Sequence, residues 1–194
     1  DDMPSELRQE FLGDINKEID RLNSVINDLL TLVSMDSGEA RMNMKSASLT
    51  DMLNETMRRL QPLARERGIE MSGAIAAGVT VNCDSMKLTQ VFYNLMDNAI
   101  TALEAIPSEK KLRVDIGEDR DSYRFSVANN GPAIPEELQE SIFREGFTTK
   151  KESGHGMGLS IVTQVLKTYK GTISLSSTEE ETVFRIRIPK SNQK

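Results

Sequence analysis

Two asparagines four residues apart are the first residues in this sequence whose spacing suggests chemistry. Asn94 and Asn98 lie in the segment QVFYNLMDNAITAL, whose apolar residues recur at helical spacing. Side chains at i and i+4 project from the same face of an α-helix, so the two amides would lie side by side. A buried amide without a partner costs about 1–3 kcal/mol. The pair therefore either bonds to backbone groups or offers its oxygens to Mg²⁺, directly or through water, while the metal holds phosphates.

A turn-forming stretch, VANNGPAIPEEL, follows a predicted strand. Residues Asn129 to Pro132 have the composition of a turn, and a plain turn is the default interpretation. A strand that ends in a polar side chain beside a glycine is also suited to contact the edge of a base. In that case Ile134 would supply an apolar wall.

Alternating glycines precede an apolar helical run in KKESGHGMGLSIV. Gly154, Gly156 and Gly158 would let backbone N–H groups approach an anion, and the start of the following helix adds its own N–H groups. Flexible loops share this composition, so the pattern alone decides nothing. It is neither a Walker A loop, since no GKS or GKT follows, nor a Rossmann turn, since no strand leads into it.

The elements that position these segments can be placed by periodicity and capping residues. Three helices are expected: 49–67, capped by Thr50 or Asp51 and stopped by Gly68; 85 to about 104, capped by Asp84; and 158–169. Short strands are expected at 69–75, 79–83, 112–116, 123–127, 172–175 and 183–188, the last two as a hairpin. This order indicates an α+β fold, a mostly antiparallel sheet covered on one face by helices.

An apolar stripe distinguishes the first 40 residues. Its spacing of three and four predicts one long amphipathic helix, ended near Gly38. The stripe either packs on the following domain or, as we favour, on a helical partner supplied by a second copy of the chain. It consists of Leu7, Phe11, Ile15, Ile19, Leu22, Ile26, Leu29 and Val33.

Composition narrows the classes of function. The chain has 194 residues and a formal net charge of −6, which argues against general nucleic-acid binding. One cysteine and one histidine exclude an internal disulfide and a Cys/His zinc site. No apolar run approaches the roughly 20 residues of a membrane span. We expect a cytoplasmic piece of a longer protein, anchored to a membrane only through segments outside this sequence.

Taken together, the three polar segments resemble the N box, G1 box and G2 box of the catalytic domain of two-component sensor histidine kinases. SIFREGFTTK resembles the F box, and GTISL and ETVFRIRIP match the closing pattern of that domain. The resemblance covers roughly residues 48–190, and NAITAL is most similar to the nitrogen-regulation and dicarboxylate-sensing branch. Upstream, NKEIDRLNSVINDLLTLVSMDSGEA resembles the second helix of the dimerisation and phosphoacceptor hairpin. The implied domains are 1–45, a truncated hairpin and linker, and 46–194, the ATP-binding domain.

The resemblance implies a two-layer α/β sandwich of the Bergerat type, with a mixed, mostly antiparallel sheet and three helices. It implies ATP and Mg²⁺ as cofactors and transfer of the γ-phosphoryl group to a histidine on a helix that this chain lacks. The implied partners are a response-regulator receiver domain and a second copy of the chain. We expect this chain to bind nucleotide but not to autophosphorylate, and we assign it no catalytic base.

The resemblance also implies roles for individual residues. Asn98 would coordinate Mg²⁺ with support from Asn94, and Asn129 would contact the adenine amino group with help from Thr182. Gly131 and Ile134 would line the base pocket. The lid would include Phe147, Thr148 and Lys150, and the phosphates would be wrapped by Gly156, Gly158 and Leu159.

Three departures from the family pattern concern binding strength. The family usually has Asp where Asn129 stands, and a neutral amide loses the charge-assisted part of the hydrogen bond to adenine. Ala133 replaces a common glycine, and Thr101 stands where many members carry a base.

Two alternative functions remain open: a degenerate kinase acting as a dimeric scaffold, or a serine kinase of the anti-sigma type. His155 falls within the lid, where we interpret it as a loop residue and not a phosphoacceptor.

Overall fold

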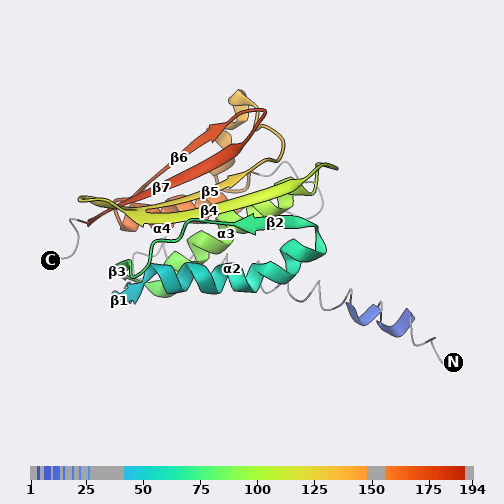
Figure 1. Cartoon of the computed structure of the whole chain (residues 1–194), viewed down its shortest axis with the longest axis horizontal. Helices are drawn as coiled ribbons and strands as arrows, with labels where there is room; N and C mark the ends of the chain where they lie inside the picture. The colour runs from blue at the N-terminus through green and yellow to red at the C-terminus, as the bar shows by residue number, and fades with distance from the viewer. Residues whose placement is uncertain are drawn as a thin grey trace. The chain divides into compact units, whose positions relative to one another are not determined.

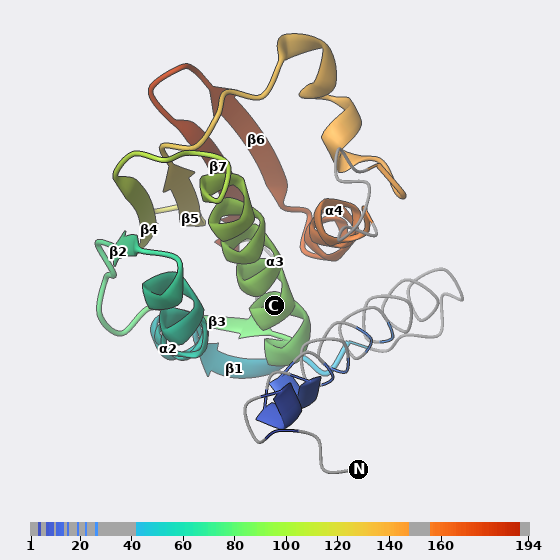
Figure 2. The same ribbon diagram turned by 90° about the vertical axis from the view of Figure 1, so that its right-hand side faces the viewer.

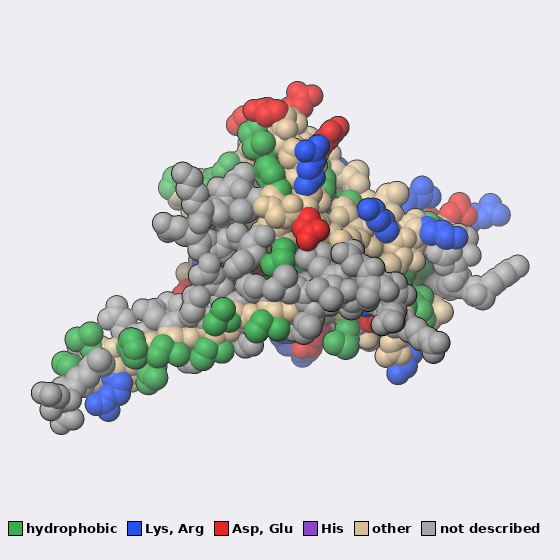
Figure 3. All heavy atoms as spheres, turned by 180° about the vertical axis from the view of Figure 1, so that it is seen from behind, with side chains coloured by type: hydrophobic (Ala, Val, Ile, Leu, Met, Phe, Trp, Pro, Cys, Tyr) green, Lys and Arg blue, Asp and Glu red, His purple; other side chains and the backbone are tan. Residues whose placement is uncertain are grey.

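The computed structural model describes residues 42–147 and 156–190 continuously, together with residues 4, 7–9, 11–13, 15, 19, 22 and 26. The chain divides into two compact units, residues 1–40 and 41–194. In the first unit, the described positions from 7 to 26 are helical, and one continuous long helix stays a prediction. Its described apolar side chains are exposed and form a row (Figure 3). The rest of the predicted long helix, including Leu29, Val33 and Gly38, lies outside the described residues.

The second unit is built on a five-stranded sheet with the order β2-β4-β5-β7-β6 (Figure 1). The pair β2–β4 is parallel, and the other neighbours are antiparallel. A separate two-stranded sheet joins β1 and β3. The mixed, mostly antiparallel sheet predicted from the sequence is confirmed. The strands are β1 (Lys45–Ser48), β2 (Ile69–Ser72), β3 (Thr80–Cys83), β4 (Lys110–Glu118), β5 (Ser122–Asn129), β6 (Thr172–Ser177) and β7 (Thr182–Pro189).

Three α-helices of this unit lie on one face of the sheet (Figures 1 and 2). They are α2 (Leu49–Glu66), α3 (Ser85–Leu103) and α4 (Gly158–Thr168), and two short 3-10 turns, η1 (Glu136–Leu138) and η2 (Ser141–Phe143), precede α4. This agrees with the predicted two-layer sandwich. The core lies between the layers, where each fully buried aliphatic side chain contributes about 1.5–3 kcal/mol. It includes Leu53, Leu88, Leu95, Ile100, Leu112, Val127, Ile161, Val165 and Ile186.

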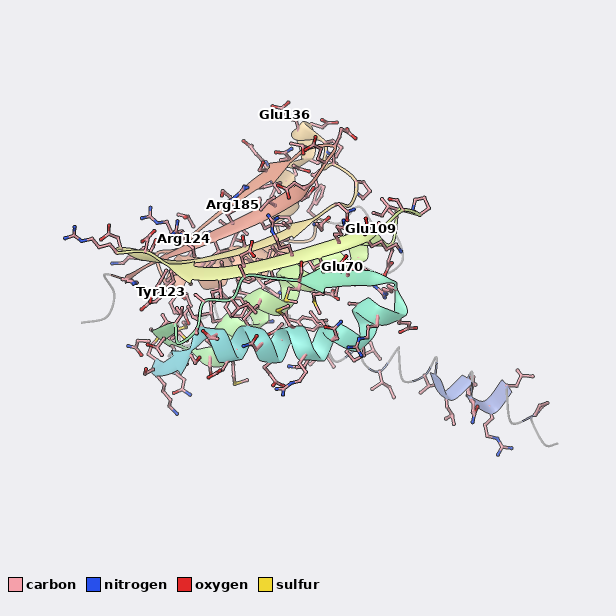
Figure 4. The ribbon with its side chains drawn as sticks, viewed as in Figure 1. Glu70, Glu109, Tyr123, Arg124, Glu136 and Arg185 are labelled. Carbon is pink, nitrogen blue, oxygen red and sulfur yellow. The ribbon has the colours of Figure 1, made fainter. Side chains whose placement is uncertain are left out.

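The opposite face of the sheet is open and charged. Arg124 on β5 and Arg185 on β7 are exposed there, while alternate residues of both strands are buried against the helices (Figure 4). This alternation is the period-2 pattern expected of a sheet with one solvated face.

Helix α2 begins differently from the prediction. Its N-cap is Ser48, whose hydroxyl accepts a hydrogen bond of 3.0 Å from the backbone N–H of Asp51. The prediction of Thr50 or Asp51 was wrong because Ser48 is also the last residue of β1, a strand that the sequence pattern did not indicate. Gly68 follows the helix with φ of 66°, the left-handed conformation expected of a glycine stop. At α3, the predicted cap Asp84 is confirmed.

Candidate functional site

The amide pair on α3 is hydrogen-bonded through nitrogen. Asn98 Nδ2 donates to the carbonyl of Asn94 at 2.8 Å, and Asn94 Nδ2 donates to the carbonyl of Gly158 at 3.1 Å. Neither Oδ1 receives a hydrogen bond from any residue that the structure describes. The first alternative raised by the sequence, bonding to backbone groups, is therefore confirmed, and the binding of Mg²⁺ stays a prediction. The NH₂ groups satisfy backbone carbonyls, and these bonds leave two amide oxygens as acceptors for a ligand.

The first residue of α4 packs directly against this pair. A Cβ added to Gly158 would lie 3.4 Å from Asn98 Nδ2 and 3.8 Å from the Cβ of Asn94. These are ordinary van der Waals distances, so α4 begins in direct contact with α3. The residue before it, Met157, makes no side-chain cap, so no side chain of the N-cap competes for the N–H groups of the first turn. An uncapped helix start beside two amide oxygens suits an anion that carries a cation.

The two chain segments that flank residues 148–155 lie in contact. Gly146 N donates to Gly156 O at 3.2 Å, and both glycines have positive φ, 74° and 64°. A Cβ on Gly156 would lie 2.5 Å from Phe147 O, which no side chain could tolerate. Phe147, a predicted lid residue, and Gly156, a predicted phosphate-binding residue, are thus brought together. Thr148, Lys150, Gly154 and His155 lie outside the described residues.

Asn129 ends β5 in a buried position, only 4% exposed. Its Oδ1 accepts a hydrogen bond of 3.0 Å from Gly131 N, closing a tight turn. A Cβ on Gly131 would lie 2.8 Å from that oxygen and 3.3 Å from Ala102 O at the end of α3. Glycine is thus required where β5 meets α3. The turn predicted by default is present, and it carries a buried polar side chain as the alternative interpretation requires.

Two hydroxyls lie beside Asn129 at the same end of the sheet. Thr182 is paired with Asn129 across β5 and β7, and it is 3% exposed. Its Oγ1 lies 2.6 Å from Ser177 Oγ, which in turn accepts a hydrogen bond of 2.8 Å from Ile134 N. The structure therefore brings Asn129, Thr182 and Ile134 to one place. Ser177 was not predicted, because nothing in GTISLSS distinguishes it from its neighbours before the register of β6 and β7 is known.

Helix α3 connects the two ends of this site. Asn94, Asn98 and Ala102 follow one another at four-residue steps, each about 6 Å along the axis. The helix is fixed on the sheet by Phe92, whose ring centroid lies 4.6 Å from that of Phe125 on β5. The predicted residue Leu159, on the first turn of α4, is half-buried. One rigid helix thus sets the spacing between the amide pair and the Asn129 end.

Within the part of the chain that the structure describes, no group of three or more His, Cys, Asp or Glu side chains could hold a metal ion. The donors available for a cation at this site are amide oxygens. Such oxygens bind hard cations, of which Mg²⁺ keeps several of its waters and also binds phosphate oxygens. The residues present therefore fit a magnesium ion that arrives with a phosphate ligand better than a metal held by protein alone.

Comparison with known proteins matches this chain to one ATPase family and to bacterial kinases. The family model of histidine kinase-, DNA gyrase B- and HSP90-like ATPases matches residues 83–192. Sensor histidine kinase ZraS of Escherichia coli (strain K12) is 31% identical over 177 residues, which are 89% of this chain and 36% of ZraS. Sporulation kinase A of Bacillus subtilis (strain 168) is 28% identical over 184 residues, 94% of this chain and 29% of that protein. The chain thus spans about a third of the length of these relatives.

Solved structures show the same architecture. The catalytic domain of histidine kinase ThkA superimposes with a TM-score of 0.70 at 31% identity, over 77% of this chain and 97% of that one. ThkA solved in complex with response regulator protein TrrA gives a TM-score of 0.75 at 28% identity, over 100% of this chain and 54% of that one.

Proposed function

Because this chain belongs to the family of histidine kinase-, DNA gyrase B- and HSP90-like ATPases, we propose that it is the ATP-binding catalytic portion of a sensor histidine kinase. The kinase names of its relatives and the fit to the ThkA catalytic domain support this assignment within the family. The nitrogen-regulation and dicarboxylate-sensing branch rests on the NAITAL segment alone. The ATP-binding domain would comprise residues 46–194, and residues 1–45 the end of a dimerisation hairpin.

The phosphate end of the site would lie between α3 and α4. Asn98 and Asn94 would hold Mg²⁺ through their Oδ1 atoms, and the ion would supply charge neutralisation to the phosphates when bound. The first-turn N–H groups of α4 would donate to phosphate oxygens. Gly156, Gly158 and Leu159 would allow the backbone to approach, and Phe147, Thr148 and Lys150 would cover the phosphates. In this arrangement the chain would position the phosphates and help to neutralise their charge. These are the two contributions that phosphoryl transfer requires from a protein.

The base end of the site would lie where β5 and β7 meet the end of α3. Asn129 would contact the purine with help from Thr182, while Gly131 and Ile134 would line the pocket. The burial of Asn129 and Thr182 supports this placement, because buried polar groups gain strength as hydrogen-bond partners in a low-dielectric site. The short segment from Asn98 to Ala102 would then span the distance between metal and base.

The γ-phosphoryl group would pass to a histidine on a helix outside this sequence, and from there to a response-regulator receiver domain. ThkA has been solved with such a regulator, which supports the class of partner. The described helices include none long and apolar enough to cross a membrane. We propose that this portion works in the cytoplasm and that any membrane anchor belongs to other segments. The names of the relatives disfavour an anti-sigma-type serine kinase, and the following measurement distinguishes an ATP-binding kinase from a degenerate scaffold.

The observation that carries the proposal is the pair of amide oxygens without described donors, in contact with the start of α4. Calorimetric titration with ATP tests it. Binding should be saturable with Mg²⁺ and weaken about tenfold or more in EDTA or in Asn98→Ala, because a charged contact worth roughly 1.5–3 kcal/mol is lost. Asn54→Ala, on the exposed side of α2, is the matched control and should bind normally. An absence of binding at millimolar ATP would instead favour the scaffold.

A further inference from the structure

We propose that Asn129 makes the base end of this site tolerant of the group at purine C6, so that the chain binds 6-oxopurine nucleotides as well as ATP. The inference rests on the proposed function, because that function brings a purine to Asn129. It depends on which hydrogen-bond donors and acceptors are presented by one buried amide and by the hydroxyls beside it.

The orientation of the Asn129 amide is fixed by the backbone. Gly131 N–H can only donate, so the atom that faces it at 3.0 Å must be the amide oxygen. Turning the amide over would place two donors against each other. The bond from Gly131 N occupies one of the two lone pairs of Oδ1, so the second lone pair and the NH₂ group have no described partner.

That NH₂ group has no described partner, although the residue is 96% enclosed. Asn129 is 4% exposed, and no hydrogen bond joins its Nδ2 to any residue that the structure describes. Among described side chains, the one fully enclosed nitrogen or oxygen without a partner is Gln164 Oε1. Nδ2 therefore has no hydrogen-bond partner among the described residues and is not fully enclosed. Its protons remain available to a group that enters the site.

Hydrogen-bond chemistry determines what such a group can be. A carboxylate accepts only, so it selects a base that presents an amino group and repels a carbonyl at the same position. An amide offers one donor and one acceptor. It can accept from the amino group of adenine through the second lone pair of Oδ1, or donate to the carbonyl of a 6-oxopurine through Nδ2. Replacing the carboxylate by an amide thus removes the repulsion that would exclude a 6-oxopurine.

The neighbouring polar groups do not restore selectivity. Thr182 Oγ1 and Ser177 Oγ lie 2.6 Å apart, and either can be the donor. Hydroxyls rotate to donate or accept as the partner requires. Neither of these two hydroxyls therefore has a fixed donor or acceptor polarity that would distinguish adenine from a 6-oxopurine.

Binding of ATP and ITP to the whole chain tests the inference. ITP carries the 6-oxo group without the 2-amino group of GTP, so the comparison isolates position 6. We expect the ratio of Kd for ITP to Kd for ATP to stay below about 10 in the native chain, because both bases find a hydrogen bond. Asn129→Asp should raise that ratio at least about tenfold, because a carboxylate repels the 6-oxo group.

Asn54→Asp provides the control, since it makes the same change of charge at an exposed helical position. It should leave the ratio unchanged. A native ratio above about 10, or a rise of less than tenfold in folded Asn129→Asp, would overturn the inference while leaving the proposed function intact. If Asn129→Asp fails to fold by circular dichroism, the native ratio alone decides. If neither nucleotide binds at millimolar concentration, the proposed function itself fails.

Discussion

Asn129 and the α3 amide pair illustrate how residue type and geometry divide the work in this site. Asn94 and Asn98 use their nitrogens on the protein, and no described donor occupies their oxygens. At Asn129, the N–H of Gly131 occupies one of the two lone pairs of the oxygen. Three asparagines would thus present different groups to one nucleotide: amide oxygens at Asn94 and Asn98, and both an NH₂ group and an oxygen lone pair without a described partner at Asn129.

The strength of ATP binding is predicted to depend on the charge at position 129. Asn129→Asp should tighten ATP binding by about an order of magnitude, because charge-assisted hydrogen bonds are roughly twice as strong as neutral ones. Calorimetry at constant Mg²⁺ measures the change. An unaltered Kd in a variant with native circular dichroism would show that residue 129 does not contact the base.

At the scale of elements, the start of α3 depends on a doubly bonded cap. Asp84 Oδ1 accepts from Lys87 N at 3.2 Å, and Oδ2 accepts from Asn43 N at 3.0 Å. Asp84→Ala should cost about 1–3 kcal/mol of unfolding free energy, since it removes a cap and a second partner. Ser48→Ala, which removes the single cap bond of α2, should cost less. Urea denaturation midpoints rank the three chains, and a native midpoint for Asp84→Ala would contradict this account.

Two buried titratable groups near the start of α3, Cys83 and Tyr169, indicate that the protein loses stability at alkaline pH. Burial raises the pKa of the Cys83 thiol from its ordinary value near 9 to about 11, with the neighbouring Asp84 carboxylate adding to the effect. Burial likewise raises the pKa of Tyr169, whose hydroxyl lies 2.9 Å from Asp84 N. Between about pH 9 and pH 11 the unfolded thiol loses its proton while the folded thiol keeps it, so the free energy of unfolding should fall.

Cys83→Ala isolates the contribution of the thiol to this pH dependence. Its unfolding free energy, measured by denaturant titration from pH 8 to pH 10.5, should fall less steeply with pH than that of the native chain. Equal slopes for the two chains would mean that the Cys83 thiol does not titrate with a raised pKa.

The sequence predicted the helices better than their capping residues, the short strand β1 or the pairing of strands. The apolar period was sufficient to find α2, α3 and α4, because amphipathic helices bury a regular stripe. The short strand β1 and the Ser48 cap were missed, since a four-residue strand carries little periodic signal. Asn94, Asn98 and Gly158 could be found from spacing, whereas Ser177 became visible only once β6 and β7 were paired. The roles of all these site residues stay predictions, and Thr148 and Lys150 lie outside the described residues.

At the scale of the whole molecule, the exposed stripe of the first unit predicts association of two chains. Phe11 and Leu22 are 56% and 53% exposed, and a row of such side chains is unfavourable in water. Joint replacement of Ile15 and Leu22 by Glu should lower the mass measured by light scattering from that of a dimer to that of a monomer. ATP affinity should not change, because the site lies in the second unit. A native chain that is already monomeric would contradict the prediction.

The central claim is that three separated segments hold one magnesium-bearing nucleotide, with its base at Asn129 and its cation at Asn98. A crystal structure of the chain with Mg²⁺ and a non-hydrolysable ATP analogue tests it most directly. We predict Asn98 Oδ1 about 2.0–2.1 Å from the metal, or one water away from it, and the purine edge at Asn129. A nucleotide bound elsewhere, or an Asn98 oxygen turned away from any cation, would contradict the account.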